Sequence, residues 1–468
     1  MNNKTKIVAT IGPATQSDEK IEQLIAAGMN VARFNTKHST PQWHSTHIKK
    51  VKKIAKKLNT PVSILLDLQG PEVRVDMPDE KPVSVSKGKF LYFTSDPKLS
   101  KKPLALVPQL VIDKLDKGDD VVLADGSCEF RVHEKGGNYL MAQALVDCQV
   151  QHRKTVNTPG KVLDMPSLTE RDFTYLSGVD KTLIDFVGLS FVRSVQDIEI
   201  LKDELKKRHF NAGIIPKIEN QAALDNLDSI IEAADAVMIA RGDLGVEVEY
   251  QELTYWQKHI INKCRLASKP VITATQMLKS MVTNPRPTRA EVSDVANSIY
   301  DGTDAVMLSE ETTIGLYPVR SVSVQAKIAE FNEQHASHNL TVDYDSDLTS
   351  SITHSAINLL KHSVVAINKI VCLTQTGRTA QLLSRFRPSI PITAVTHNPS
   401  TYNRLTLSYG VVPHLIELEQ KETVGFKSLI NQLKEQNALR IGERVLFIHG
   451  KNFLKNAITN TLSILEIT

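Results

Sequence analysis

The chain has 468 residues, which exceeds the size of one ordinary hydrophobic core and predicts two or three domains. Its hydrophobic content of 41% and charged content of 23% are typical of a globular enzyme, and a net charge of +4 gives no support to nucleic-acid binding. The four cysteines form no Cys-x-x-Cys pair, which argues against a zinc site or a disulfide framework. Without a signal-peptide pattern or an apolar run of membrane-spanning length, we expect a cytoplasmic protein that binds no membrane.

Short apolar runs alternate with stretches of helical spacing over most of the chain. Eight of these runs are predicted strands: 7–11, 31–34, 62–66, 186–191, 214–218, 236–239, 271–274 and 305–308. Eight parallel strands joined by helical crossovers predict a (β/α)8 TIM barrel. A doubly wound open sheet is the alternative, but it gives no reason for the number of strands to stop at eight.

Two segments break this alternation and predict further domains. Residues 75–154 contain short β-like runs separated by Lys, Asp, Gly and Pro, which predicts a small β-barrel lid domain inserted after the third barrel strand. A polar run at 334–339 predicts a linker, and a new strand and helix alternation follows it. We therefore expect a barrel at 1–74 and 155–334, a lid at 75–154 and a C-terminal α/β domain at 335–468.

Polar residues follow the predicted barrel strands, at the end where barrel active sites gather. Lys217 and Glu219 lie at the end of the fifth strand, and Asp243 follows the sixth. The lysine can neutralise a phosphoryl group, and carboxylate oxygens are ligands that Mg²⁺ prefers, although a pair of salt bridges at the rim of a sheet is the alternative. Other strands end in Arg33, Asn35, Asp67, Ser190 and Thr275.

Two loops have the character of anion sites. Gly242 and Gly245 bracket Asp243 where a strand leads into a helix, so backbone amides there can approach an anion closely. In the C-terminal domain, Thr374, Thr376 and Thr379 lie between a strand and a helix, where their hydroxyls and the helix N-terminus could hold a phosphate.

Several longer motifs carry a resemblance to a known family. They include Lys217-Ile-Glu-Asn220, the run from Ala240 to Glu247, and the segments 6–13, 28–31, 70–74, 190–193, 272–278, 284–291, 294–297 and 301–304. Over essentially its whole length the chain resembles pyruvate kinases. The resemblance implies a glycolytic phosphotransferase that moves a phosphoryl group from phosphoenolpyruvate to ADP, giving pyruvate and ATP. It also implies a barrel with a β lid and a C-terminal regulatory domain, usually assembled as a homotetramer.

By resemblance, each motif also implies a role for its residues. Lys217 would stabilise the transferred group and the enolate, with Mg²⁺ or Mn²⁺ held by Glu219 and Asp243. The other implied roles are phosphate contacts by Arg33 and Arg74, substrate contacts by Thr275, Ser190, Gly242 and Asp243, and nucleotide contacts by His38, Lys154 and Asp125.

One departure from the family concerns the monovalent-cation site. The segment Arg33-Phe-Asn-Thr-Lys-His-Ser39 stands where the family usually has Arg-Leu-Asn-Phe-Ser-His-Gly. In the family, that serine binds K⁺ together with the residues that match Asn35 and Asp67. The ammonium of Lys37 cannot ligate K⁺, but it could occupy the position of the cation beside Asp67 and Glu72. We expect a built-in cation and activity independent of K⁺; the alternative is a lysine turned to solvent beside a damaged site.

Other departures leave further alternatives open. Glu310 stands where the family has glycine, so we expect an anion or backbone strain that lowers turnover. The glycine-rich effector turn is replaced at 450–459, which argues against fructose 1,6-bisphosphate activation, while a monophosphate effector or no effector remains open. Two other functions are a Mg²⁺-dependent lyase or aldolase acting through a pyruvate enolate, and a weak paralogue that binds phosphoenolpyruvate as a sensor.

Overall fold

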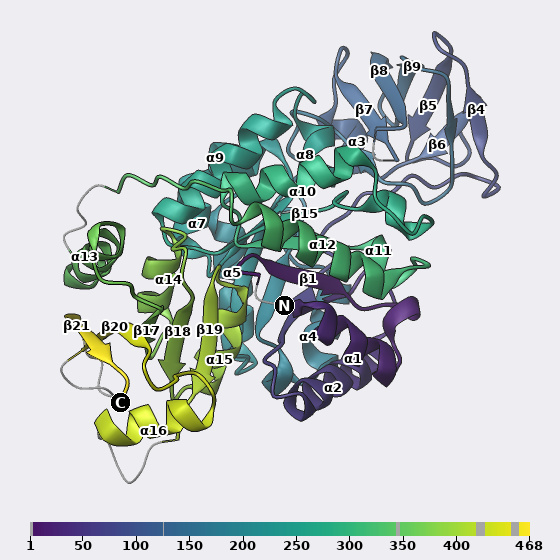
Figure 1. The fold of residues 1–468 in the computed structure, drawn as a ribbon. Helices are drawn as coiled ribbons and strands as arrows, with labels where there is room; N and C mark the ends of the chain where they lie inside the picture. The colour runs from purple at the N-terminus through teal and green to yellow at the C-terminus, as the bar shows by residue number, and fades with distance from the viewer. Residues whose placement is uncertain (1–2, 125, 343–346, 418–425, 451–457) are drawn as a thin grey trace.

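A closed eight-stranded parallel barrel forms the centre of the molecule (Figure 1). The computed structural model describes residues 3–124, 126–342, 347–417, 426–450 and 458–468. The barrel strands are β1 (Lys6–Thr10), β2 (Met29–Asn35), β3 (Ser63–Asp67), β12 (Phe186–Leu189), β13 (Gly213–Ile218), β14 (Val237–Ala240), β15 (Val271–Ala274) and β16 (Ala305–Leu308). All eight predicted strands and the TIM barrel are confirmed. Only β12 ends clearly early, because Phe191 takes a left-handed φ of 55° that an extended strand cannot continue.

Amphipathic helices surround the barrel and bury their apolar faces against its strands. In α2 (Pro41–Lys57), Ile48, Val51 and Ile54 are buried, and most of the interleaved lysines lie on the outer face, whereas Lys52 pairs with the buried Asp185 at 2.6 Å. A capping box formed by Thr288 and Glu291 begins the helix at 289–301. The other helices of the barrel are α1 (Asp18–Ala27), α4 (Glu170–Gly178), α5 (Val195–Lys207), α6 (Gln221–Asp225), α7 (Leu227–Ala233), α8 (Arg241–Glu247), α9 (Leu253–Leu266), α10 (Arg289–Asp301), α11 (Glu310–Thr313) and α12 (Pro318–Asn332).

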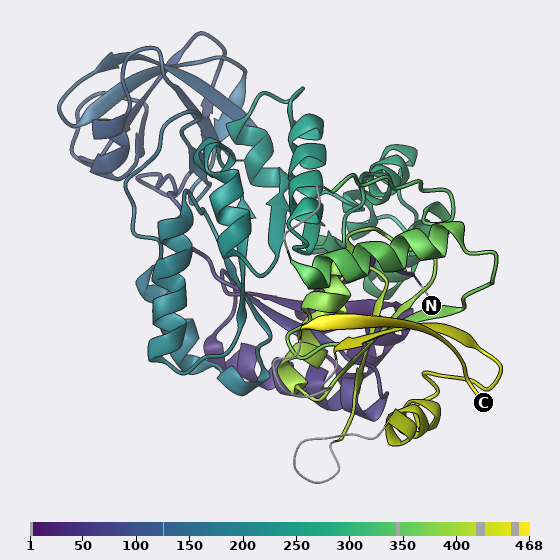
Figure 2. The ribbon, with the colours of Figure 1, turned by 90° about the vertical axis from the view of Figure 1, so that its left-hand side faces the viewer.

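A curled β domain projects from the carboxyl-terminal side of β3 and stands away from the barrel (Figure 2). One sheet has the order β11-β7-β8-β9-β5-β6, and β10 pairs with β4. Its elements are β4 (Val83–Val85), β5 (Phe90–Thr94), β6 (Leu104–Leu106), α3 (Gln109–Lys114), β7 (Asp120–Leu123), β8 (Cys128–Lys135), β9 (Tyr139–Ala144), β10 (Cys148–Val150) and β11 (Val156–Asn157). The sequence did not predict β6, β10 and β11, because two or three residues are too few to show a period.

The C-terminal domain is a five-stranded sheet, ordered β19-β18-β17-β20-β21, with only β21 antiparallel to its neighbour. Its elements are α13 (Leu348–His362), β17 (Lys369–Leu373), α14 (Arg378–Ser384), β18 (Ile392–Thr396), α15 (Pro399–Arg404), β19 (Val411–Leu415), α16 (Phe426–Glu435), β20 (Arg444–Gly450) and β21 (Thr459–Glu466). Leu407 of this domain packs, fully buried, with the apolar interior of the barrel, including Val8 and Phe186. It therefore closes the amino-terminal end of the barrel. The domain boundaries at residues 74, 154 and 334 stay predictions.

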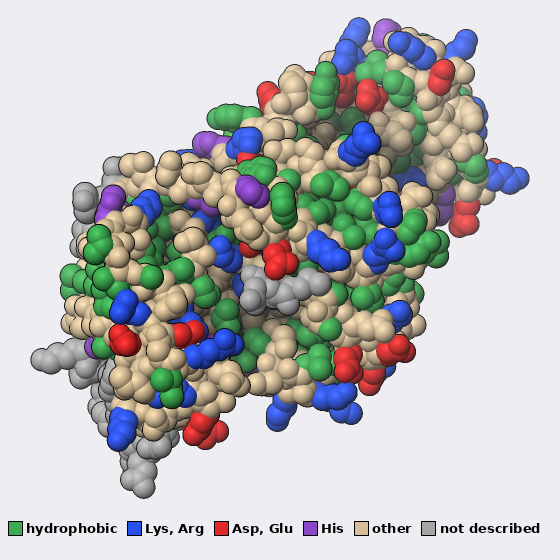
Figure 3. All heavy atoms as spheres, viewed as in Figure 1, with side chains coloured by type: hydrophobic (Ala, Val, Ile, Leu, Met, Phe, Trp, Pro, Cys, Tyr) green, Lys and Arg blue, Asp and Glu red, His purple; other side chains and the backbone are tan. Residues whose placement is uncertain are grey.

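Neither sign of charge dominates the face of the molecule drawn in Figure 3. Figure 3 shows basic and acidic side chains interspersed over the face it presents. Within the described parts of the chain, none of the helices combines the length and apolar character needed to span a bilayer.

Candidate active site

Lys217, at the carboxyl end of β13, lies between two buried carboxylates. Its Nζ is 3.0 Å from Oε1 of Glu219 and 3.5 Å from Oδ1 of Asp67. Burial opposes the charge on Lys217, but the carboxylates of Asp67 and Glu219 outweigh this effect and raise its pKa above the ordinary value. The structure therefore keeps a charged ammonium group ready inside the site.

Glu219 is almost fully buried and accepts a second hydrogen bond, from the Phe191 amide, at 2.6 Å. Burial raises its pKa to about 7, and the negative charge of Asp243 on α8 adds to that rise, while Lys217 opposes it. A cation beside both carboxylates would relieve this repulsion, so the donor set fits a divalent metal. The described residues contain no group of three or more His, Cys, Asp or Glu side chains that could hold a metal. Two carboxylates completed by substrate oxygens and water are a common Mg²⁺ arrangement.

Asp67, at the end of β3, is paired with Arg33 at the end of β2. The Nε atom of Arg33 donates to Oδ2 of Asp67 at 2.7 Å, and its Nη1 donates to the Thr10 hydroxyl at 3.1 Å. Burial alone would raise the pKa of Asp67, but Lys217 and Arg33 hold it below its ordinary value. Gly188 makes room for this carboxylate, because a Cβ there would lie 2.7 Å from Oδ1 of Asp67. Gly188 was not predicted from the sequence as a site residue, although a glycine inside an apolar strand often marks a close approach.

Thr275, after β15, is held in a left-handed conformation with a φ of 70°. Its hydroxyl accepts the Gly242 amide hydrogen at 2.8 Å, and its carbonyl accepts a hydrogen bond from Arg241 Nη2 at 2.7 Å. Arg241 is buried and makes a two-point ion pair with Asp294, at 2.7 and 2.8 Å. Such a backbone costs on the order of 1 kcal/mol or more and persists only when its surroundings impose it. The role of Arg241 and Asp294 was not predicted, because it depends on a contact between α8 and α10.

Ser190 and its neighbours form the turn beside Lys217. The Ser190 hydroxyl donates to the carbonyl of Leu68 at 2.6 Å, which ties the end of β12 to the loop after β3. Gly70 in that loop has a φ of 68°, and a Cβ there would lie 2.8 Å from the Ser190 Cβ. Ser190 therefore shapes the loop, and its contact with a substrate stays a prediction.

Lys37 contacts Glu72 and not Asp67. Its Nζ lies 2.6 Å from Oε1 of Glu72, whose other oxygen accepts a hydrogen bond from Arg74 Nη2 at 2.8 Å. The Lys37 amide donates to the Asn35 side chain at 3.1 Å. Asp67 is instead bound by Arg33 and Lys217. Lys37 is thus turned inward, as the built-in-cation hypothesis requires, but with only one of its two expected carboxylates.

A basic pocket of about 390 Å³ lies between the barrel and the β domain. Lys37, Arg74, Arg153 and Lys154 line it, and Arg74 also donates to the Arg153 carbonyl. Arg153 was not predicted from the sequence, although its position next to Lys154 forms a basic pair that was a usable signal. Asp125 lies outside the described residues.

His38 follows Lys37 on the same loop. Burial, and then the positive charges of Lys37, Arg33, Arg74 and Arg171, lower its pKa. The ring is therefore neutral near pH 7. The positive charges around it suit the binding of phosphates.

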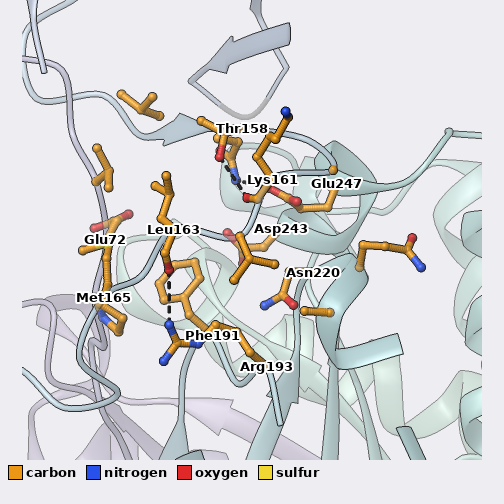
Figure 4. Close-up of a pocket in the computed structure, with 18 of the residues that line it drawn as sticks. Glu72, Thr158, Lys161, Leu163, Met165, Phe191, Arg193, Asn220, Asp243 and Glu247 are labelled. Atoms are coloured by element: carbon orange, nitrogen blue, oxygen red, sulfur yellow. Dashed lines mark hydrogen bonds between the residues drawn. The ribbon is translucent and has the colours of Figure 1, made fainter. Parts of the chain in front are cut away.

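A second cavity, of about 170 Å³, adjoins Asp243 beneath the segment that returns from the β domain. Figure 4 shows Asp243, Glu247 and Lys161 on one side of it and Glu72 on the other. Burial raises the pKa of Glu247 to about 6, against the effect of a hydrogen bond from Asn157. This cavity lies between the β-domain connection and the predicted metal carboxylates.

Glu310 does not impose the expected backbone strain. Glu310 begins α11, and it is not among the residues of the described chain whose φ is positive. Its half-exposed carboxylate pairs with Lys279. The glycine of the family is thus replaced here by an ordinary helical residue whose charge has a partner.

In the C-terminal domain, the three predicted threonines use their hydroxyls differently. Thr374 accepts the Gly377 amide hydrogen at 2.9 Å, and the buried Thr379 hydroxyl contacts that of Thr459 at 2.9 Å. Thr376 is exposed and makes a long, 3.5 Å contact with the Arg378 amide. Most of the substituted effector turn, residues 451–457, lies outside the described residues.

Comparisons with known proteins agree with this geometry. The family model "Pyruvate kinase, barrel domain" matches residues 2–322, and "Pyruvate kinase, alpha/beta domain" matches residues 350–465. A pyruvate kinase of Thermococcus litoralis is 40% identical over 100% of this chain and 99% of its own length, and one of Bacillus licheniformis is 40% identical over 87% and 71%. The crystal structure of a Cryptosporidium parvum pyruvate kinase superposes with a TM-score of 0.91 at 31% identity, covering 100% and 97% of the two chains.

These matches decide between the functions left open by the sequence. They give no support to a binding sensor, and none of the relatives named above is described as a lyase or an aldolase. The family acts on phosphoenolpyruvate and ADP and requires a divalent metal. The chain belongs to the pyruvate kinase family and is a phosphotransferase.

Proposed function

We propose that the chain transfers the phosphoryl group of phosphoenolpyruvate to ADP at the carboxyl ends of its barrel strands, with Mg²⁺ or Mn²⁺ and without K⁺. The observation that carries this proposal is Lys217, held between Asp67 and Glu219 beside Asp243. Phosphoryl transfer is mainly positioning and charge neutralisation, which a buried, preorganised ammonium group supplies.

Four parts of the site have proposed roles. Lys217 donates to the oxygens of the transferred group and the developing enolate. Glu219 and Asp243 would hold Mg²⁺, which would supply charge neutralisation to the phosphoryl transfer. Because the Thr275 hydroxyl already accepts from Gly242, its own hydrogen is left to donate to the substrate carboxylate. Arg33 and Arg74 are each anchored by a carboxylate and by one further acceptor, which fixes the guanidinium and leaves its remaining hydrogens for phosphate oxygens.

ADP is proposed to bind in the basic pocket under the β domain. Arg153, Lys154, Arg74 and Lys37 line it and supply positive charge for the phosphates. His38 stays neutral near pH 7 and contributes hydrogen bonds in place of charge. Asp125 belongs to the same proposed nucleotide site.

K⁺ independence rests on the contact between Lys37 and Glu72. The ammonium places a fixed positive charge on Glu72 at the edge of the basic pocket, and we propose that this charge replaces the contribution of a bound K⁺. Pyruvate formation should be measured in K⁺-free buffer and after adding K⁺, for the wild type, Lys37→Ser and the control Lys50→Ser, whose weak ion pair with Asp18 lies on the surface.

The wild type and Lys50→Ser should respond to K⁺ by less than about twofold. Without K⁺, the kcat/KM of Lys37→Ser should be about tenfold below that of the wild type, a loss that corresponds to the free energy of one charge contact. Adding K⁺ should restore part of this activity. Severalfold activation of the wild type by K⁺ would remove the proposal of a built-in cation and leave the kinase in place.

We also propose that the protein is cytoplasmic and forms a homotetramer. Light scattering coupled to gel filtration would test the homotetramer. A phosphate effector on Thr374, Thr376 and Thr379 stays a prediction.

A further inference from the structure

The loop of residues 36–39, between β2 and α2, carries two residues of the proposed site, Lys37 and His38. Ser39 ends this loop with a left-handed φ of 64°, at a position where the family usually has glycine. A left-handed backbone is unfavourable for serine and persists only when neighbouring groups impose it. Side chains of α2 and α4 hold the loop in this conformation.

Tyr175 of α4 contacts the end of the loop. Its side chain is only 2% exposed, and its hydroxyl lies 2.8 Å from the Ser39 carbonyl and 3.1 Å from the His38 carbonyl. Burial raises the pKa of Tyr175, so the hydroxyl keeps its hydrogen and donates it to these carbonyls. Both acceptors are backbone groups, so the contact fixes the path of the chain.

Arg171, one turn before Tyr175 on α4, contacts both ends of the loop. Its Nε donates to the Thr36 carbonyl at 2.9 Å, and its Nη2 lies 3.4 Å from the Ser39 carbonyl. Nη2 also donates to the Tyr175 hydroxyl at 3.3 Å, and the guanidinium lies 5.2 Å from the centre of the Tyr175 ring. Arg171 and Tyr175 therefore form one unit beneath the loop, with a charged donor that strengthens its hydrogen bonds.

His44 of α2 adds a third donor. Its Nε2 lies 3.1 Å from the His38 carbonyl, and because a carbonyl can only accept, the neutral ring carries its hydrogen on Nε2. The ring packs edge-on against Tyr175, with the two ring centres 5.1 Å apart. The carbonyls of residues 36, 38 and 39 thus all accept hydrogen bonds from helix side chains.

The amides of the same loop are fixed from the barrel side. The Lys37 amide donates to the Asn35 side chain at 3.1 Å, and the His38 amide donates to the Asn35 carbonyl at 3.3 Å. The Lys37 side chain reaches Glu72 and lines the basic pocket with Lys154. The backbone of the loop is therefore bound on two sides, and its basic side chain is directed at the pocket.

We propose that Arg171 and Tyr175 are positioning residues for ADP that act through the backbone of this loop. They hold Lys37 and His38 at the places where the ADP phosphates meet them, so that little ordering remains when the nucleotide binds. This inference rests on the proposed binding of ADP in the basic pocket. Without the two side chains, part of the binding free energy of ADP is spent on ordering the loop, and the affinity for ADP falls.

Steady-state kinetics of the full chain, with ADP and phosphoenolpyruvate varied in turn, test this proposal. Tyr175→Phe removes only a hydroxyl and should raise the KM for ADP about threefold to tenfold, as expected for one hydrogen bond. The kcat and the KM for phosphoenolpyruvate should change by less than about twofold, because Arg33 and Lys217 keep their own contacts with Asp67.

Tyr300→Phe is the matched control. It removes a hydroxyl that donates to Asn332 at 2.6 Å, between α10 and α12, and should change none of the three kinetic values. Adding Arg171→Met to Tyr175→Phe should raise the KM for ADP further, to about tenfold or more above the wild type. If this double variant fails to fold, Tyr175→Phe decides alone.

An unchanged KM for ADP in Tyr175→Phe would overturn the proposal. So would a lower kcat with both KM values unchanged, because a smaller folded fraction lowers kcat alone and would make Tyr175 a structural residue. Lys154→Met separates this inference from the proposed nucleotide site. If Lys154→Met raises the KM for ADP and Tyr175→Phe does not, the positioning role alone fails; if neither raises it, ADP binds elsewhere and both proposals fail.

Discussion

The carboxyl ends of the barrel strands and the threonine loop of the C-terminal domain both have the sequence character of phosphate sites, but they differ in structure. At the strand ends, Asp67 of β3 meets Lys217, which lies beside Glu219 at the end of β13, and both carboxylates are within 3.5 Å of the ammonium group. In the loop, the Thr374 hydroxyl accepts a hydrogen bond from the Gly377 amide, and the Thr379 hydroxyl contacts the hydroxyl of Thr459. Barrel packing brings Asp67 to Lys217 from a distant strand, whereas the Thr374 hydroxyl is already satisfied inside its own loop by Gly377.

The largest expected effect is at Lys217. Lys217→Met should lower kcat by about 10³-fold or more, because it removes preorganised charge where phosphoryl charge develops. Steady-state pyruvate formation measures this. Lys258→Met, which removes a surface lysine paired with Asp301, is the control and should keep near-normal kcat. Activity of Lys217→Met within about tenfold of the wild type would contradict the central role of this lysine.

A smaller loss is expected at Asp294, which acts through Arg241. Asp294→Asn should lower the free energy of unfolding by about 2 kcal/mol, because Arg241 stays buried without its two-point partner. The kcat should fall about tenfold as Thr275 loses its fixed backbone. Thermal unfolding and pyruvate formation report the two effects.

The matched control is Asp228→Asn, which breaks an exposed ion pair and should change stability by less than about 0.5 kcal/mol. If Asp294→Asn altered stability but left kcat unchanged, Arg241 would be a structural residue only.

Acid should weaken the barrel through His44, which lies under the His38 loop. Burial lowers its pKa to about 4, although its contact with the His38 carbonyl opposes the shift. The unfolded chain, with an ordinary pKa near 6.5, then binds more protons, so stability falls as pH drops from about 6.5 to 4.

His44→Gln should remove up to about 3 kcal/mol of this pH-dependent loss. Urea unfolding at several pH values measures it, and exposed His133→Gln should leave the profile unchanged. A wild-type profile that matches the His44→Gln profile would contradict this assignment.

The smallest effect is expected at Thr376. Thr376→Val removes an exposed hydroxyl with one long contact, so the free energy of unfolding should change by less than about 0.5 kcal/mol. Differential scanning calorimetry measures this. A larger loss would mean that the loop depends on Thr376 as strongly as the strand ends depend on their charged residues.

Much of the fold was predictable because its signals are local. Apolar runs located all eight barrel strands, and the capping pattern at Thr288 and Glu291 located the start of α10. Strands β6, β10 and β11 were missed, since they are held by pairing with other strands and not by a pattern of their own.

The sequence by itself determined the parallel barrel and the residues that end each strand, because strand period and chain connectivity suffice for both. Only the tertiary structure decided the partners of those residues: Arg33 on Asp67, Lys37 on Glu72 and Arg241 on Thr275. Glu310 likewise pairs with Lys279, and its backbone is not strained. Ion pairs depend on distances of a few ångströms between separate elements, and no spacing along one chain encodes those distances.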